Sequence, residues 1–206
     1  MILLEGKPIV HHIVEYWRKY TDNFLFVVGY KKNHVIEYAC QLDVKSQFIE
    51  QKELRGIAHA ISLAKDAVTD NFIVVLGDCL CLGTFSRPSA MIQGFGVWKT
   101  ELVECIRNNY AVIIEGDSIS RAIEKPKEIY NKFCGMGIYF FHKNMFGYIE
   151  KTRPSVLRNE IEITDVIQTM IDSHERFTPV HFHGEYINIT YPHDITTAER
   201  LLRGYR

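Results

Sequence analysis

Two kinds of apolar pattern alternate along the first third of the chain. Continuous apolar runs of strand length predict strands over Phe24–Val28 and Phe72–Leu76, and a further short strand is expected over Ser46–Glu50. Apolar residues that recur every three or four positions predict helices over Pro8–Tyr20, Asn33–Leu42 and Gly56–Val68. Strands that alternate with helices form parallel pairs through right-handed crossovers. The first half therefore predicts a parallel sheet flanked by helices, with the third strand buried on both faces.

The second half has a different pattern. Ala111–Ile114 and Ile119–Glu124 flank the turn-forming stretch Glu115-Gly116-Asp117-Ser118, which predicts an antiparallel hairpin. Further strands are expected over Gly137–Phe141 and Phe177–Phe182, and further helices begin at the capping residues Thr164 and Asp194. We expect one α/β domain over residues 1–206, with a mixed sheet that hairpins extend in its second half.

Charge and cysteine content narrow the class of protein. The formal net charge is −1, with 24 basic and 25 acidic residues, so the composition favours neither a nucleic acid nor a membrane surface as partner. The apolar runs are too short for a membrane-spanning helix, and the first residues lack the basic leader of a secretory signal. Five cysteines without a framework spacing suggest reduced thiols, and hence a cytoplasmic protein.

The stretch FIVVLGDCL places a lone carboxylate, Asp78, directly after a predicted strand. Ligands of open α/β sheets bind at the carboxyl ends of parallel strands, and Gly77 would allow a ligand or backbone to come close. Asp78 is therefore a candidate metal ligand that faces a phosphate. Capping of the following turn is an equally good interpretation from the local sequence.

A second charged position ends the predicted hairpin. Glu124 and Lys125 are adjacent, so on a strand their side chains point to opposite sides and do not simply pair. One could hold a hydroxylated ligand and the other a phosphate. The simpler interpretation is a solvated strand end, stopped by Pro126.

Two later segments carry oxygen ligands. Glu160, Glu162 and Asp165 crowd the start of a predicted helix, where the helix dipole favours acidic residues. One glutamate could instead turn into a pocket toward sugar hydroxyls. Asn188 lies in GEYINITYPHD, and its amide oxygen could bind Mg²⁺ or satisfy a turn.

Two other patterns look like metal sites. Cys79 and Cys81 form a C-x-C beside Asp78, and His181 and His183 share one face of a predicted strand. Neither pair has further ligands at a suitable spacing, so free thiols and a solvated strand face are the simpler interpretations.

Taken together, the chain resembles the sugar-1-phosphate nucleotidylyltransferases, most of all the glucose-1-phosphate thymidylyltransferase type. The resemblance rests on a series of segments that have the same order in that family: GKPIVHHIVEYW, VVGYKK, GIAHAI, VVLGDCL, NYAVI, EKPKE, GMGIYFF, NEIEITDVI and YINITYPHD. It implies a Rossmann-like fold of the glycosyltransferase-A type. It also implies that an NTP and a sugar 1-phosphate give an NDP-sugar and pyrophosphate, with Mg²⁺ as cofactor.

The resemblance also implies roles for single residues. Asp78 and Asn188 match metal ligands, Gln51 and Gly56 match positions that meet the nucleobase, and Lys125 matches the ligand of the sugar phosphate. The remaining sugar-binding positions are Tyr110, Ala111, Glu124, Gly137 and Glu162. Asp78 and Lys125 would be the catalytic pair, since the reaction depends on positioning and charge stabilisation.

The chain departs from the family pattern at several points, among them its start, position 111, the short stretch between Leu80 and Tyr110, and NITYP, which stands where the family has Asp-x-Gly-Thr-Pro. It begins just after the place where the family has a strand, a Gly-rich phosphate loop and a Pro-Lys pair, and Ala111 replaces a glycine. A misassigned start, an incomplete chain or a natural loss would each explain the first departure. Two alternatives to a sugar-1-phosphate nucleotidylyltransferase stay open. One is an inactive homologue that binds sugar phosphate or NDP-sugar as a partner subunit, and the other is a cytidylyltransferase for a non-sugar phosphate. The sequence leaves open whether the chain forms a homo-oligomer.

Overall fold

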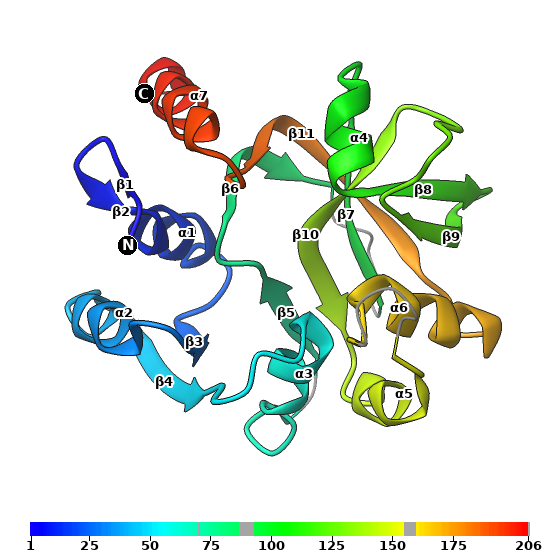
Figure 1. The fold of residues 1–206 in the computed structure, drawn as a ribbon, viewed down its shortest axis with the longest axis horizontal. Helices are drawn as coiled ribbons and strands as arrows, with labels where there is room; N and C mark the ends of the chain where they lie inside the picture. Colours follow the sequence, from blue (N-terminus) through cyan, green and yellow to red (C-terminus); the bar gives the residue numbers. More distant parts are fainter. Residues whose placement is uncertain (70, 87–92, 155–159, 206) are drawn as a thin grey trace. The chain divides into compact units, whose positions relative to one another are not determined.

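A computed structural model describes residues 1–69, 71–86, 93–154 and 160–205 (Figure 1). Asn159, part of the NEIEITDVI segment, lies outside these residues. The chain divides into two compact units. The first contains Met1–Leu54, Leu76–Gly83 and Gly184–Arg206, and the second contains Arg55–Val75 and Thr84–His183. Strands β6 (Cys79–Phe85) and β11 (Thr178–Asn188) contribute residues to both units.

The first unit begins with a small antiparallel pair and continues as alternating helices and strands. Its elements are β1 (Leu3–Leu4), β2 (Lys7–Pro8), α1 (Ile9–Trp17), β3 (Asn23–Val28), α2 (Lys32–Ala39), β4 (Lys45–Glu50) and α7 (Pro192–Tyr205). Strands β3 and β4 pair in parallel, as the sequence predicts. A core cluster joins segments from both ends of the chain: it contains Leu4, Ile9, Leu80, Leu82, Ile189 and Ala198.

Helix α7 begins two residues before the predicted start at Asp194. The predicted cap position is therefore wrong, because Asp194 lies inside the first turn. Its Oδ2 instead accepts the backbone N–H groups of Thr190 (2.9 Å) and Tyr191 (2.7 Å), which precede the helix.

The second unit is built around strand β10 (Phe133–Phe141). Its other elements are α3 (Ile57–Ser62), β5 (Phe72–Val75), β7 (Gly94–Lys99), α4 (Val103–Asn108), β8 (Tyr110–Glu115), β9 (Ser118–Glu124), α5 (Met145–Lys151) and α6 (Ile163–Asp172). Within the described residues, the strand order is β6-β11-β7-β10-β8-β9, and β5 also pairs with β10. Strand β11 is parallel to β7, whereas β10 is antiparallel to its three neighbours. The prediction of a mixed sheet flanked by helices is confirmed.

Aromatic side chains fill the core of the second unit. Phe95, Tyr139, Phe141 and Phe177 are almost fully buried and come from β7, β10 and the residue before β11. The predicted hairpin of β8 and β9 is confirmed, with its turn at residues 116–117. Strand β10 begins four residues before the predicted Gly137, because the buried run extends back to Cys134.

Two further expectations about local structure are wrong. Strand β5 is half-buried and antiparallel to β10, so Asp78 does not follow a buried strand of a parallel sheet. Thr164 is not the cap of α6: Glu162 holds the N-cap position without a side-chain capping bond, and the Thr164 hydroxyl bonds Glu124 instead.

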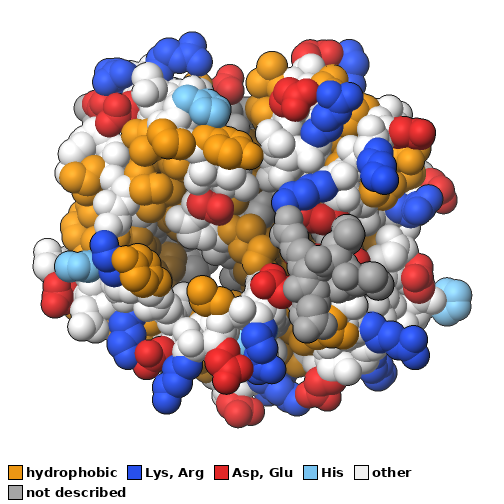
Figure 2. All heavy atoms as spheres, in the orientation of Figure 1, with side chains coloured by type: hydrophobic (Ala, Val, Ile, Leu, Met, Phe, Trp, Pro, Cys, Tyr) orange, Lys and Arg blue, Asp and Glu red, His pale blue; other side chains and the backbone are white. Residues whose placement is uncertain are grey.

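The surface agrees with the near-zero net charge. On the face drawn in Figure 2, basic and acidic side chains are interspersed without a field of one sign. Among the described residues, no helix combines the length and the apolar character that crossing a membrane requires.

Candidate functional site

The first unit brings the two predicted metal ligands together. Asp78 lies in the turn before β6, and Asn188 is the last residue of β11. The backbone N–H of Ile189, next to Asn188, donates to the Asp78 carbonyl at 2.9 Å. The Oδ1 atom of Asn188 is buried. One backbone hydrogen bond thus fixes the two oxygen-bearing residues beside each other.

Asp78 is in an environment that disfavours an uncompensated charge. Its side chain is partly buried, and burial raises the pKa of the carboxyl group, opposed by a hydrogen bond from Cys79. No ion pair to Asp78 is found in the part of the chain that the structure describes. A carboxylate and an amide oxygen are hard donors that suit Mg²⁺, and a cation would compensate the buried charge. The residues present therefore fit the predicted ion.

The two predicted nucleobase residues lie in different units. Gln51 follows β4, and its N–H donates to the Val28 carbonyl at 2.8 Å, which extends the β3–β4 ladder. Gly56 is the N-cap of α3, and its carbonyl accepts a hydrogen bond from the Ala60 N–H.

Gly77, next to Asp78, is not required by crowding within the protein. Among the described residues, no protein atom lies within 4 Å of a Cβ added at this position.

The second unit brings the predicted sugar-phosphate residues onto neighbouring strands. Tyr110 pairs with Glu124 across β8 and β9, and also with Gly135 across β8 and β10. Ala111, next on β8, pairs with Cys134. Gly137 lies on β10 in the stretch where pairing with β7 shifts register. These positions are thus within a few residues of one another on the sheet.

The side chain of Tyr110 belongs to the core. It is 4% exposed, and its hydroxyl donates to the Met136 carbonyl at 2.7 Å. Its ring covers Gly135 so closely that a Cβ there would lie 1.8 Å from it. Of this residue, the backbone is therefore the part that could meet a sugar.

Ala111 differs from the family glycine by one methyl group. Ala111 is 1% exposed and packs with Ile106 and Cys134 in a small apolar cluster. The additional methyl therefore fills space inside the protein.

Glu124 is held by Thr164, which was predicted to cap a helix. The Thr164 hydroxyl donates to Glu124 Oε2 at 3.3 Å. Helix α6 packs along β9, as Figure 1 shows, and this brings its first turn to Glu124. Glu162 starts the same helix, and its carbonyl accepts the N–H groups of Asp165 and Val166.

Lys125 has an unusual backbone. Its φ of 41° is in the left-handed region, which a side chain with a Cβ rarely adopts. The Lys125 N–H donates to the Asn109 carbonyl at 2.9 Å, which ties it to the end of α4. The side chain is exposed and makes no ion pair within the described residues, so its ammonium group is available to an anionic ligand.

Three positioning residues carry no signal in a single sequence. Thr164 resembles a helix cap, Asn109 a helix end, and Cys79 a core residue. Only the packing of α6 on β9, the turn after α4 and the pairing near Asp78 give them partners in the site. Thr164 and Asn109 bond residues far away in the sequence, and Cys79, although next to Asp78, depends on the distant Tyr186 for its second bond, so no spacing rule could have found these roles.

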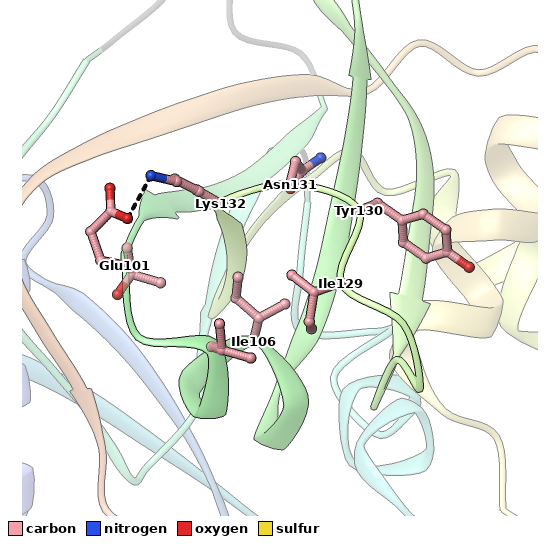
Figure 3. A pocket seen from close by; sticks show the side chains of 8 residues that line it. Glu101, Ile106, Ile129, Tyr130, Asn131 and Lys132 are labelled. Atoms are coloured by element: carbon pink, nitrogen blue, oxygen red, sulfur yellow. Dashed lines mark ion pairs between the residues drawn. The ribbon is translucent and has the colours of Figure 1, made fainter.

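A pocket in the second unit borders the apolar cluster that contains Ala111, because its residues Ile106 and Ile129 pack in that cluster. Ile106 and Ile129 form its apolar wall, the exposed Tyr130 stands on one side, and the Lys132–Glu101 ion pair (2.6 Å) is on the other (Figure 3). No predicted ligand-binding residue lines it. The pocket therefore adds nothing to the predicted site.

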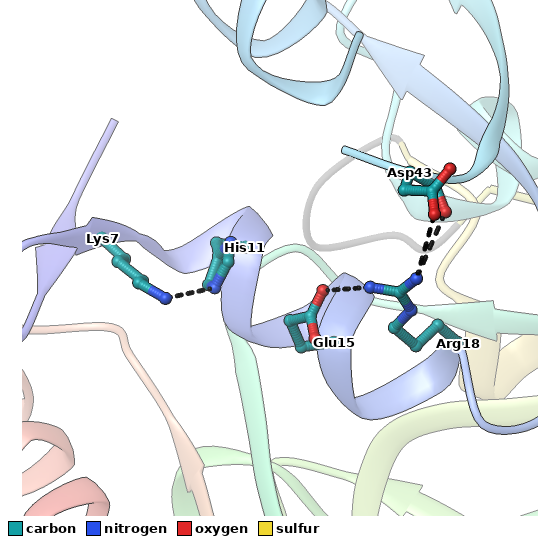
Figure 4. Close-up of polar contacts among 5 residues, drawn as sticks. All are labelled: Lys7, His11, Glu15, Arg18 and Asp43. Carbon is teal, nitrogen blue, oxygen red and sulfur yellow. Dashed lines mark hydrogen bonds and ion pairs between the residues drawn. The ribbon is translucent and has the colours of Figure 1, made fainter. Parts of the chain in front are cut away.

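The other polar patterns have structural partners. Around α1, the Lys7 ammonium of β2 donates to His11 Nε2 at 3.0 Å, and the Arg18 guanidinium donates to the Glu15 carboxylate and to the Asp43 carbonyl (Figure 4).

The histidine pair of β11 also has a partner. His183 bonds the Ser86 hydroxyl at 2.9 Å. Among the described residues, no three His, Cys, Asp or Glu side chains are grouped so that they could hold a metal ion.

Comparison with known proteins decides the family. The model of the nucleotidyl transferase family matches residues 1–203. The chain belongs to this family. The bifunctional protein GlmU of Methanocaldococcus jannaschii is 33% identical over 204 residues, which are 98% of this chain and 48% of GlmU. The UTP–glucose-1-phosphate uridylyltransferase AglF of Haloferax volcanii is 27% identical over 98% of this chain and 87% of AglF. The chain spans about half the length of the GlmU relatives that it matches.

Solved structures of this family share the fold. The inositol-1-phosphate CTP transferase from T. maritima superimposes with a TM-score of 0.82 at 17% identity, over 99% of this chain and 85% of that one. A UDP-glucose pyrophosphorylase complexed with UDP-glucose gives 0.80 at 19% identity, over 100% and 90%. The family and the fold predicted from the sequence are both confirmed.

Proposed function

We propose that the chain transfers a nucleotidyl group from an NTP to a sugar 1-phosphate, and that Mg²⁺ is required. The observation that carries the proposal is the pair Asp78 and Asn188, fixed beside each other by the Ile189–Asp78 hydrogen bond. In the proposed reaction, a phosphate oxygen of the sugar 1-phosphate bonds to the α-phosphorus of the NTP. The bond from that phosphorus to the bridging oxygen breaks, and pyrophosphate leaves.

Each group of residues has its own task in this proposal. Asp78 and Asn188 would hold Mg²⁺, which, when bound, supplies positive charge near the phosphates. The Lys125 ammonium would bind the sugar phosphate, and Glu124, held by Thr164, would accept hydrogen bonds from sugar hydroxyls. Glu162 and the backbone at Tyr110, Ala111 and Gly137 would complete the sugar side, while Gln51 and Gly56 would meet the base.

The relatives suggest which substrates to try first. AglF is a UTP–glucose-1-phosphate uridylyltransferase by name and matches over most of its length, so we propose UTP and a hexose 1-phosphate. The five free cysteines are compatible with work in the cytoplasm, which we also propose.

The proposal is tested by pyrophosphate release from UTP, CTP, dTTP and GTP with glucose 1-phosphate, N-acetylglucosamine 1-phosphate and inositol 1-phosphate. We expect Mg²⁺-dependent release with one sugar 1-phosphate. Lys125→Met should raise KM for the sugar phosphate by about tenfold or more, the scale of a charged hydrogen bond, without changing the Mg²⁺ requirement. Binding of sugar phosphate or NDP-sugar without any release would instead favour the inactive partner subunit.

A further inference from the structure

Two hydrogen bonds, both made by the Cys79 thiol, link the Asp78 carboxylate to Tyr186 of strand β11. The Cys79 Sγ lies 3.5 Å from Asp78 Oδ1 and 3.0 Å from the Tyr186 hydroxyl oxygen. Cys79 is 2% exposed and Tyr186 is 5% exposed, so water does not compete for these bonds. All three residues belong to the first unit.

The chemistry of the three groups fixes the direction of the bonds. An ionised carboxylate can only accept, so the thiol S–H donates to Asp78 Oδ1. The sulfur then accepts from the Tyr186 O–H.

The end of β11 and the residue after it are linked to Asp78 at two points, one of them through Cys79. Tyr186 bonds the side-chain partner of Asp78, and Ile189 bonds the Asp78 carbonyl at 2.9 Å. Asn188 lies between these two anchors in sequence. Backbone and carboxylate of Asp78 are thus both set by the strand that presents the second oxygen ligand.

We propose that Cys79 and Tyr186 are positioning residues that orient the Asp78 carboxylate toward a divalent cation shared with Asn188. The thiol holds Oδ1, which leaves Oδ2 to bind the cation. This inference rests on the proposed metal role of Asp78 and Asn188.

The chain offers a matched control for a cysteine substitution. Cys81 lies two residues further along β6 and is 4% exposed. Its thiol makes no hydrogen bond within the described residues. Cys81→Ala therefore removes an equally buried sulfur without touching the link to Asp78.

The test uses Mn²⁺ as the probe, measured by the loss of its free-ion EPR signal on titration of the purified, metal-free chain. We expect Cys79→Ala to weaken Mn²⁺ binding by about tenfold, the scale of losing an outer partner of a metal ligand. Cys79→Ser, which can still donate and accept, should remain within about threefold of the wild type, and Cys81→Ala should not change binding. In the pyrophosphate assay, the Mg²⁺ concentration for half-maximal rate should rise for Cys79→Ala, while KM for the sugar phosphate stays constant.

The outcomes distinguish failure of the positioning role of Cys79 and Tyr186 from failure of the proposed metal role of Asp78. If Asp78→Asn leaves Mn²⁺ binding unchanged, the metal role is wrong and the inference fails with it. If Asp78→Asn abolishes binding but Cys79→Ala and Tyr186→Phe bind as tightly as the wild type, the metal role stands and the positioning role is overturned. Should Cys79→Ala fail to fold, Tyr186→Phe decides: about tenfold weaker binding supports the inference, and binding within about threefold of the wild type contradicts it.

Discussion

Removing the hydroxyl of Tyr110 tests whether this residue serves the site through its backbone. The side chain is 4% exposed, and its hydroxyl donates to the buried Met136 carbonyl at 2.7 Å. The substitution Tyr110→Phe leaves the ring in place above Gly135 and deletes only this donor. Loss of one partner from a buried hydrogen bond costs about 1–3 kcal/mol of unfolding free energy.

The measurement is equilibrium urea unfolding followed by far-UV circular dichroism. We expect the midpoint to fall while the slope stays constant, because the surface exposed on unfolding does not change. The matched control is Tyr30→Phe, which deletes the same atom from a side chain that is 84% exposed and should leave the midpoint unchanged. KM for the sugar phosphate should be similar in both variants.

Two results would refute this reasoning. A Tyr110→Phe variant as stable as the wild type would mean that the Met136 bond contributes nothing. A stable variant with a strongly raised KM would mean that the hydroxyl itself meets the substrate, and Tyr110 would then be a ligand through its side chain.

Three further predictions follow from other contacts. Gly135→Ala should lower the unfolding free energy by about 3 kcal/mol or more in the same urea assay, because the new Cβ would lie 1.8 Å from the Tyr110 ring; a change below about 1 kcal/mol would show that the ring moves freely. Lys125→Gly should keep or raise the free energy of unfolding, by up to about 1 kcal/mol, because glycine tolerates the φ of 41°. The same variant should lose affinity for the sugar phosphate in calorimetric titration. Retained affinity would exclude the ammonium group as a ligand. Burial, and to a smaller extent His183, lower the pKa of His181, so the unfolded chain binds more protons and the folded protein loses stability as pH falls below about 6.5. His181→Gln should reduce that loss in thermal unfolding between pH 7 and pH 5, and an unchanged pH profile would contradict the shift.

Local patterns predicted the elements whose signals are local. The hairpin of β8 and β9 follows from two apolar runs around a turn that contains Gly116. Helix α1 follows from its apolar spacing and from Pro8, which precedes its first residue. Such segments can be predicted from the sequence, because the interactions that stabilise them join residues close in sequence.

Elements that depend on distant partners were not predicted. Strand β7 carries two glycines and looks like a loop, but an added Cβ at Gly94 would lie 2.2 Å from the Thr178 carbonyl oxygen of β11. This glycine is therefore a consequence of strand pairing. The strand pairs of β10 and the short helices α4 and α5 likewise depend on tertiary contacts that no local pattern encodes.

In the candidate site, too, some residues could be predicted from the sequence and others depend on distant partners. The family resemblance selected Asp78, Asn188, Glu124 and Lys125, and the structure places the first two beside each other in one unit and the other two at one strand end in the second. Of the residues that orient them, Cys79 is a neighbour of Asp78, whereas Tyr186 and Thr164 come from distant parts of the sequence. Their roles appear only when β11 meets β6 and when α6 packs on β9.

The most direct test of the proposed reaction is ³¹P NMR of a mixture of UTP, Mg²⁺, hexose 1-phosphate and the purified chain. We predict that the UTP and sugar-phosphate resonances decline together while a pyrophosphate resonance and two coupled diphosphate resonances grow in equal amounts. The same mixture with Asp78→Asn should remain unchanged. Growth of inorganic phosphate alone, or equal turnover by wild type and Asp78→Asn, would contradict the account.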